Sequence, residues 1–263
     1  MHSTLTHAAL FASLVATAAY LAFLVRQRPL FASAGTFALL GAALLQTGAL
    51  GIRWLQLGIA PVTNTPEALA FSALLIAVIY LGIQRYYKLP VVGAFVTPLA
   101  SVAWIGAMSA SDVAVPANLR SSWLLVHISA AFLGEAVLAL AFVTATVFLV
   151  LDAQLKQKRP FALTARLPSL DLLDGLTDRF LLVGLPLLTL AIITGALWLK
   201  QQNGQFFSAE PRQGLAIINW VIYAAIVHMR LTLGYRGRRL AYATVLGFAA
   251  LVASFLLYAR HGA

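Results

Sequence analysis

Apolar residues dominate the chain in long blocks that are separated by short polar connections. Each block has roughly the 20 residues that a helix needs to cross the hydrocarbon layer of a membrane. The pattern predicts eight helices, at 7–25, 31–51, 67–85, 90–109, 122–151, 178–199, 214–231 and 239–258. We therefore predict an all-α polytopic membrane bundle, with a single transmembrane domain over residues 1–263.

The longest connection between these predicted helices runs over residues 152–177. Within it, Leu170, Leu173 and Leu176 are three residues apart, with acidic residues between them. This spacing is typical of a short amphipathic helix that lies at the membrane surface, and Ser169 is a suitable N-cap for it. We expect a connector that packs against the bundle; a docking site for a partner protein is the alternative.

The composition and the distribution of charge support a membrane protein. Hydrophobic residues make up 61% of the chain and charged residues only 10%, against about 25% in a soluble domain. Successive connections between the helices must lie on opposite sides of the membrane. This places thirteen of the eighteen basic residues on one side, which should be the cytoplasmic side. Both termini are then outside, and we expect a multi-pass protein of the bacterial inner (cytoplasmic) membrane, surrounded by membrane lipid.

The net charge of +10 does not indicate a nucleic-acid partner, because no basic stripe with interleaved aromatic residues occurs. Cysteine is absent, which excludes disulfides, thiolate metal sites and a covalent haem attachment motif within this chain. The sequence has no nucleophile–base pair, no glycine-rich phosphate loop and no carboxylates with metal-ligand spacing. Nothing in it specifies an enzyme.

Two histidines, His127 and His228, fall inside predicted helices. Ionisable residues in a membrane are costly and are therefore functional candidates, and a neutral imidazole is a common ligand of haem iron. A hydrogen-bonded structural histidine is the alternative for each. The two differ in depth by about 12 Å, so we do not expect them to bind opposite faces of one iron. His7, at the outer mouth of the first helix, is the better candidate to bind opposite His127.

Glu135 is the acidic residue deepest in an apolar block. It lies two helical turns from His127, on roughly the same face and about 12 Å deeper. It is a candidate for a proton relay or for the partner of a buried cation; a protonated or hydrogen-bonded structural glutamate is the alternative. Trp123 suits the outer membrane interface one turn before His127.

Short motifs follow one another in a fixed order along the chain. They are P-x-x-N-x-x-E at 61–67, W-L-x-x-H at 123–127, T-G-x-x-W at 194–198, W-x-x-Y at 220–223, H-x-R at 228–230 and G-Y-R-G-R-R at 234–239. In this order and spacing the chain resembles the CcsA/ResC/HemX-like family of cytochrome c assembly membrane proteins. The resemblance covers most of the length and is strongest after Ser122.

The resemblance implies that the chain handles haem. His127 matches a histidine that holds haem at the outer face in this family, and His228 matches one that holds a haem within the membrane. The implied cofactor is haem b, and the implied partners are membrane proteins of cytochrome c assembly or of a haem pathway. Arg53, Arg120 or Arg212 could pair with haem propionates; generic interface arginines are the alternative.

The chain also departs from the family's pattern. The family's haem-presenting loop has the form W-x-W-D-P, and here Phe207, Ala209, Glu210 and Pro211 occupy those places. The second outer histidine has no room before the eighth helix, and Gln46 stands where relatives often carry histidine. These departures resemble the shorter YpjD-like branch, which lacks an intact tryptophan-rich haem loop.

We therefore expect an inner-membrane haem-binding protein of the cytochrome c assembly type. One alternative is a cofactor-free membrane accessory protein that regulates a partner enzyme or transporter, which a purified protein without a Soret band would favour. A second alternative is a proton-coupled transporter of a small solute. It requires a polar cavity around Glu135 in the middle of the membrane.

Overall fold

The computed structural model describes residues 2–58, 62, 64–108, 121–156, 168–208 and 210–261. These residues form no strand and eight α-helices: α1 (His2–Arg26), α2 (Pro29–Leu57), α3 (Thr65–Tyr87), α4 (Pro90–Met108), α5 (Ser122–Lys156), α6 (Leu170–Asn203), α7 (Pro211–Thr232) and α8 (Arg238–His261). All eight are long and apolar enough to cross a membrane. The predicted all-α polytopic fold is confirmed, whereas the orientation of the termini stays a prediction.

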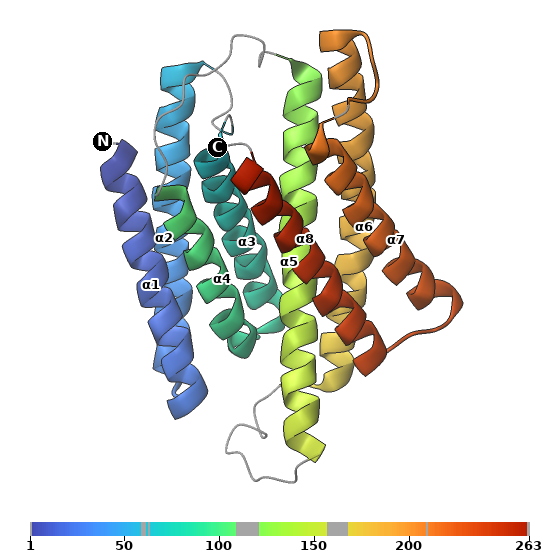
Figure 1. Ribbon diagram of the computed structural model, residues 1–263. Helices are drawn as coiled ribbons and strands as arrows, with labels where there is room; N and C mark the ends of the chain where they lie inside the picture. The colour runs from blue at the N-terminus through green and yellow to red at the C-terminus, as the bar shows by residue number, and fades with distance from the viewer. Residues whose placement is uncertain are drawn as a thin grey trace. The chain divides into compact units, whose positions relative to one another are not determined.

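The helices pack as two compact units, with α1–α4 in the first and α5–α8 in the second (Figure 1). The first unit comprises residues 1–115 and 159–168, and the second comprises residues 116–158 and 169–263. The single domain that the sequence predicts over the whole chain stays a prediction, and each unit is described by itself.

The first unit is built around a fully buried tyrosine. Tyr20 of α1 lies between Gly35 of α2 and Gly93 of α4, and its ring meets the edge of Tyr80 of α3 at a centroid distance of 5.8 Å. A Cβ atom added at either glycine would lie 2.8 Å from the Tyr20 ring. The absence of a side chain at both positions therefore lets three helices approach a large aromatic ring closely.

The second unit is organised around an antiparallel pair of long helices. Figure 1 shows α5 and α6 side by side, and α8 packs against α5 while α7 packs against α6 and α8. Its buried core includes Leu138, Leu181, Tyr223 and Leu240. At 1.5 Å per residue, the 35 residues of α5 span about 52 Å, well beyond the roughly 30 Å of hydrocarbon. The ends of α5 therefore reach past the hydrocarbon layer.

The start of α6 differs from the prediction. Ser169 is the N-cap, as predicted, and its Oγ accepts the N–H of Leu172 at 3.2 Å. The helix then continues without a break to Asn203, so the predicted helix at 178–199 is too short, and residues 170–177 belong to α6 instead of forming a helix of their own. The reason is packing, because Leu173 and Leu176 are buried within the unit rather than facing a membrane surface.

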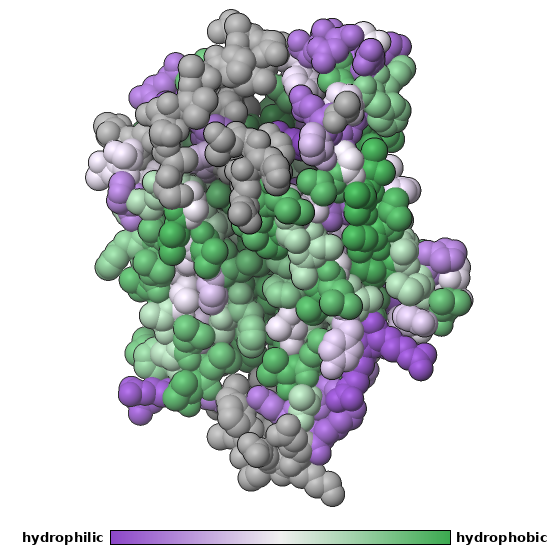
Figure 2. Space-filling view, in the orientation of Figure 1, coloured by the Kyte–Doolittle hydropathy of each residue, from purple (hydrophilic) through white to green (hydrophobic). Residues whose placement is uncertain are grey.

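Large apolar side chains lie on the outside of both units. Val25, Phe37 and Leu246 are each about 70–80% exposed, and Figure 2 shows hydrophobic residues over much of the visible face. Exposed apolar surface on this scale is unfavourable in water and is what lipid solvates. The surface therefore agrees with the eight apolar helices in indicating a multi-pass membrane protein.

Candidate functional site

His127 lies in the second turn of α5 and is fixed by a bond to the neighbouring helix. Its Nδ1 lies 2.7 Å from the carbonyl oxygen of Ala191 in α6. A carbonyl oxygen can only accept, so Nδ1 carries a hydrogen, and in the neutral ring Nε2 then carries the lone pair. No hydrogen bond to Nε2 occurs among the described residues, and the side chain is half-buried. This tautomer is the one that a metal ligand needs when it binds through Nε2.

The T-G-x-x-W motif of α6 provides the space for this ring. A Cβ atom added at Gly195 would lie 2.8 Å from Nδ1 of His127, closer than real Cβ atoms come to another side chain. The preceding Thr194 donates its hydroxyl to the carbonyl of Leu190 at 2.7 Å, with the Ala191 carbonyl at 3.2 Å. Gly195 therefore admits the imidazole, and the Ala191 carbonyl orients it.

Trp123 and Phe207, the two aromatic residues singled out in the sequence, lie at the same end of the second unit as His127. Ser121, just before α5, donates to the side chain of Gln201 near the end of α6 at 2.9 Å. Trp123 is 45% exposed at the start of α5, and Phe207 is 63% exposed in the loop that follows α6. The structure thus places both at the same end of the second unit, with much of each ring uncovered; their role at a site stays a prediction.

The loop between α6 and α7 is held by Gln213 of α7. Its Oε1 accepts the N–H of Ser208 at 2.7 Å, and its Nε2 donates to the carbonyl of Phe206 at 3.2 Å. The Phe206 ring lies under the ammonium group of Lys200, at 4.4 Å from the centroid. The described part of this loop, up to Ser208, is therefore tied to the start of α7.

Arg212, at the start of α7, lies close enough to interact electrostatically with both His127 and Glu135. Glu135 is half-buried and lies within electrostatic range of Tyr223, whose hydroxyl is buried with no hydrogen-bond partner among the described residues. The carbonyl oxygen of the Asn219 side chain, one turn earlier on α7, is also buried and has no partner in the described part of the chain. Glu135 therefore lies among polar groups, and its roles as a relay or as a structural residue both stay predictions.

The other arginines proposed for propionates differ from Arg212. In the first unit, Nε of Arg53 donates to Glu67 at 3.0 Å, and both side chains are largely buried. Asn64 caps α3, because its side chain accepts the Glu67 N–H at 2.9 Å. Asn64 thus caps the start of α3, and Glu67 joins α3 to α2 through its pair with Arg53. Arg120 lies outside the described residues.

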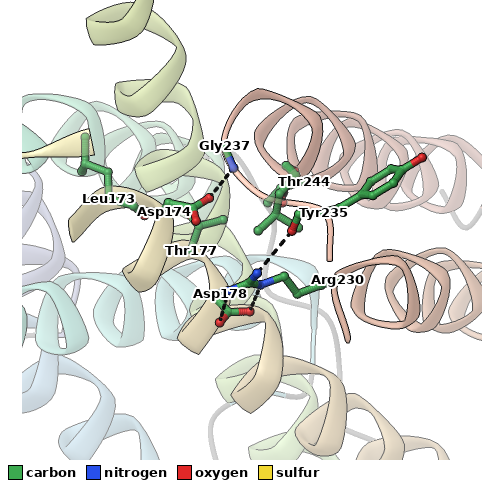
Figure 3. A network of polar contacts seen from close by, with 9 residues as sticks. Leu173, Asp174, Thr177, Asp178, Arg230, Tyr235, Gly237 and Thr244 are labelled. Atoms are coloured by element: carbon green, nitrogen blue, oxygen red, sulfur yellow. Dashed lines mark hydrogen bonds and ion pairs between the residues drawn. The ribbon is translucent and has the colours of Figure 1, made fainter. Parts of the chain in front are cut away.

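His228 has an exposed ring on the last turns of α7, and no hydrogen bond to that ring occurs among the described residues. Two residues later, Arg230 forms a two-pronged ion pair with Asp178 of α6, at 2.7 Å and 2.9 Å (Figure 3). Side chains two residues apart on a helix point about 200° apart. The Arg230 pair therefore turns His228 away from α6.

His7 lies in the first unit, so the structure does not test whether it stands opposite His127. Its side chain is exposed, and its Nδ1 lies 2.6 Å from the carbonyl oxygen of Ser3, one turn earlier in the same helix. No group of three or more histidine, aspartate or glutamate side chains in the described part of the chain could hold a metal ion. The pairing of His7 with His127 stays a prediction.

The family described as Cytochrome C assembly protein matches residues 62–259, which include α3 to α7 and nearly all of α8. The chain belongs to this cytochrome c assembly family. A relative named cytochrome c biogenesis protein CcsA, from Synechococcus sp. (strain CC9902), is 32% identical over 243 residues, covering 82% of this chain and 80% of the relative. The CcsA of Guillardia theta is 32% identical over 226 residues, covering 76% and 73%.

A solved structure named Cytochrome c Heme Lyase CcmF shares the fold of this cytochrome c assembly protein, with a TM-score of 0.69 at 18% identity. The match covers 97% of this chain and 46% of that one, so the chain spans less than half of that protein's length. The predicted family is therefore confirmed. The assignment to a shorter branch within it stays a prediction.

Most of the residues that position His127 and the end of α7 could not be predicted from the sequence. The signal for Gly195 is present in the T-G-x-x-W motif, because a glycine in a membrane helix often marks a close approach. The signal for Asp174 and Asp178 is their four-residue spacing, which places two acids on one face of a helix. The sequence shows neither which partner they meet nor that Ala191 orients His127.

Proposed function

We propose that this chain is a membrane protein of cytochrome c assembly that holds haem b through Nε2 of His127. The observation that carries the proposal is the hydrogen bond from Nδ1 of His127 to the Ala191 carbonyl. In the neutral ring this bond leaves the lone pair on Nε2, and that is the form of histidine that ligates haem iron. The chain has no cysteine, so this proposal concerns non-covalent binding within it.

Neighbouring groups at the same end of the second unit fit a porphyrin. Trp123 and Phe207 offer exposed aromatic surface, which suits contact with a flat, largely apolar ring. Arg212 lies within electrostatic range of His127, and a guanidinium group pairs well with a propionate carboxylate. We propose these three residues as further contacts of the haem.

The other two histidines complete the proposal. We assign His7 to the position opposite His127, and His228 to a separate, deeper haem. His7 and His228 both have exposed side chains, which a ligand or a partner can reach.

The relatives support the wider role. They are named cytochrome c biogenesis proteins, and the protein with the similar fold is named a haem lyase. We propose that the chain acts in the inner membrane of a bacterium, together with other membrane proteins of the same assembly system.

The absorption spectrum of the purified protein tests this function. We expect a Soret band after expression with a haem supply, and its loss in His127→Ala. His228→Ala should remove only the part that belongs to a second haem. His261→Ala is the matched control, because it also removes an imidazole but has no role in the proposal.

Two results would contradict the proposal. A Soret band of equal size in wild type and His127→Ala would remove His127 as a ligand. The absence of any Soret band, even after reconstitution with haem, would favour the cofactor-free accessory protein instead.

A further inference from the structure

The turn between α7 and α8 forms a pocket of about 440 Å³, lined by Leu233, Gly234, Tyr235, Arg236, Arg238 and Arg239. We refer to it as the arginine pocket. Gly234 and Gly237 have φ values of 64° and 60°, the left-handed conformation that glycine adopts readily, so the chain reverses within a few residues. The pocket lies directly beyond the ends of two membrane helices.

The walls of the arginine pocket are held by bonds to the rest of the second unit. Asp174 of α6 accepts the N–H of Gly237 at 2.7 Å, and Arg230 donates to the carbonyl of Tyr235 at 3.4 Å (Figure 3). The N–H of Tyr235 also lies 3.3 Å from the carbonyl of Met229. A turn tied to α6 and α7 in this way is preorganised for a ligand.

The arginine pocket has an excess of positive charge. Arg238 is paired with Asp152 of α5, and Asp178 is already occupied by Arg230. Arg236 and Arg239 have no acidic partner among the described residues, and the guanidinium of Arg239 lies 5.7 Å from the centroid of the Tyr235 ring. Two exposed guanidinium groups thus border the arginine pocket and can bind an anion there.

An apolar surface continues from these arginines along α8. Tyr242 is 57% exposed and Leu246 is 70% exposed, three and seven residues after Arg239, so the three lie on one face of the helix. Figure 2 shows hydrophilic residues at the start of α8 that border hydrophobic surface. Cationic, aromatic and aliphatic groups follow one another along the helix, as the headgroup and acyl chains of a phospholipid require.

We propose that the arginine pocket binds the phosphodiester headgroup of an anionic phospholipid, whose acyl chains lie along Tyr242 and Leu246. The pocket is open and has room for a headgroup at its arginines, and the apolar face of α8 accommodates the acyl chains. Basic pockets at the ends of membrane helices attract anionic headgroups by charge. A free phosphate ion would use the arginines but would gain nothing from the α8 face.

Native mass spectrometry of the full-length protein in detergent tests this site. Wild type should retain phosphatidylglycerol about tenfold more tightly than zwitterionic phosphatidylcholine. Arg236→Gln with Arg239→Gln should lower the affinity for phosphatidylglycerol about tenfold, and Arg236→Gln alone should lower it about threefold. The single variant keeps the test decisive if the double variant fails to fold. It should fold like wild type, because the Arg236 side chain is exposed and makes no bond among the described residues.

The matched control is Arg28→Gln with Arg85→Gln, which removes the same charge from exposed arginines of the first unit. This control should bind phosphatidylglycerol like wild type. Equal losses in both double variants would show diffuse attraction and overturn the site. Equal retention of the two lipids by wild type would overturn it too. Full displacement of the lipid by millimolar inorganic phosphate would show a free-anion site instead of a lipid site.

Discussion

The imidazole rings of three histidines differ in what holds them. The ring of His127 bonds to another helix, the ring of His7 bonds to its own helix, and the ring of His228 has no bond among the described residues. A bond across two packed helices fixes a ring more firmly than one within a single turn, because both helices would have to move to release it. The orientation of His127 therefore depends on how closely α5 and α6 approach.

Gly195→Ala tests this dependence. The added methyl group would lie 2.8 Å from Nδ1 of His127, so the ring must move and lose its bond to Ala191. We expect the affinity for haem to fall about tenfold, as is typical when an outer group that orients a ligand is disturbed. Haem titration followed at the Soret band measures this.

Gly175→Ala is the control for this variant. It makes the same change in the same helix, and an added Cβ there would meet nothing within 4 Å. Haem affinity should be unchanged in this variant. Equal affinities in both alanine variants would show that the ring of His127 does not depend on the space at Gly195.

At the scale of the helices, one ion pair helps to fix the rotation of α7. Arg230 and Asp178 are 12% and 20% exposed, and their two hydrogen bonds hold the last turns of α7 against α6. Arg230→Met leaves Asp178 without this partner and should lower the free energy of unfolding by about 2 kcal/mol. A thermal unfolding curve in detergent measures this loss.

Lys156→Gln provides the comparison for Arg230→Met. Its partner is Asp152, but the lysine is 57% exposed and the nitrogen–oxygen distance is 3.5 Å. Its loss should cost about 0.5 kcal/mol or less. If both variants unfold at the same temperature as wild type, the ion pair does not stabilise α7.

The positions of the helices could be predicted from the sequence because apolar blocks and prolines mark them directly. The start of α6 could not be predicted. The spacing of Leu173 and Leu176 fits a helix at the membrane surface and a helix packed within the bundle equally well. Their burial depends on how α6 packs against its neighbours, α5 above all. Local periodicity carries no information about that choice.

The candidate site could be predicted in part. The sequence places His127, Trp123 and Phe207 at one end of the bundle, because helix direction alternates along the chain. It does not show how each helix is rotated, since a helix that is apolar all round gives no preferred face. The bond to Ala191 and the pair of Arg230 with Asp178 depend on that rotation.

At the scale of the whole chain, the asymmetry of basic residues predicts which side faces the cytoplasm. The chain has no cysteine, so single cysteines can report topology without background labelling. A membrane-impermeant maleimide should label Ser3→Cys in intact spheroplasts. It should label Arg28→Cys only after the membrane is opened. The reverse pattern would contradict the predicted orientation.

The central claim is that the Nε2 of His127 binds iron, and imidazole rescue tests it most directly. His127→Gly removes the ligand and leaves a space next to Gly195 that free imidazole can enter. We predict that this variant loses the Soret band of the wild type and that added imidazole restores it. A wild-type spectrum without added imidazole, or no restoration at any concentration, would contradict the account.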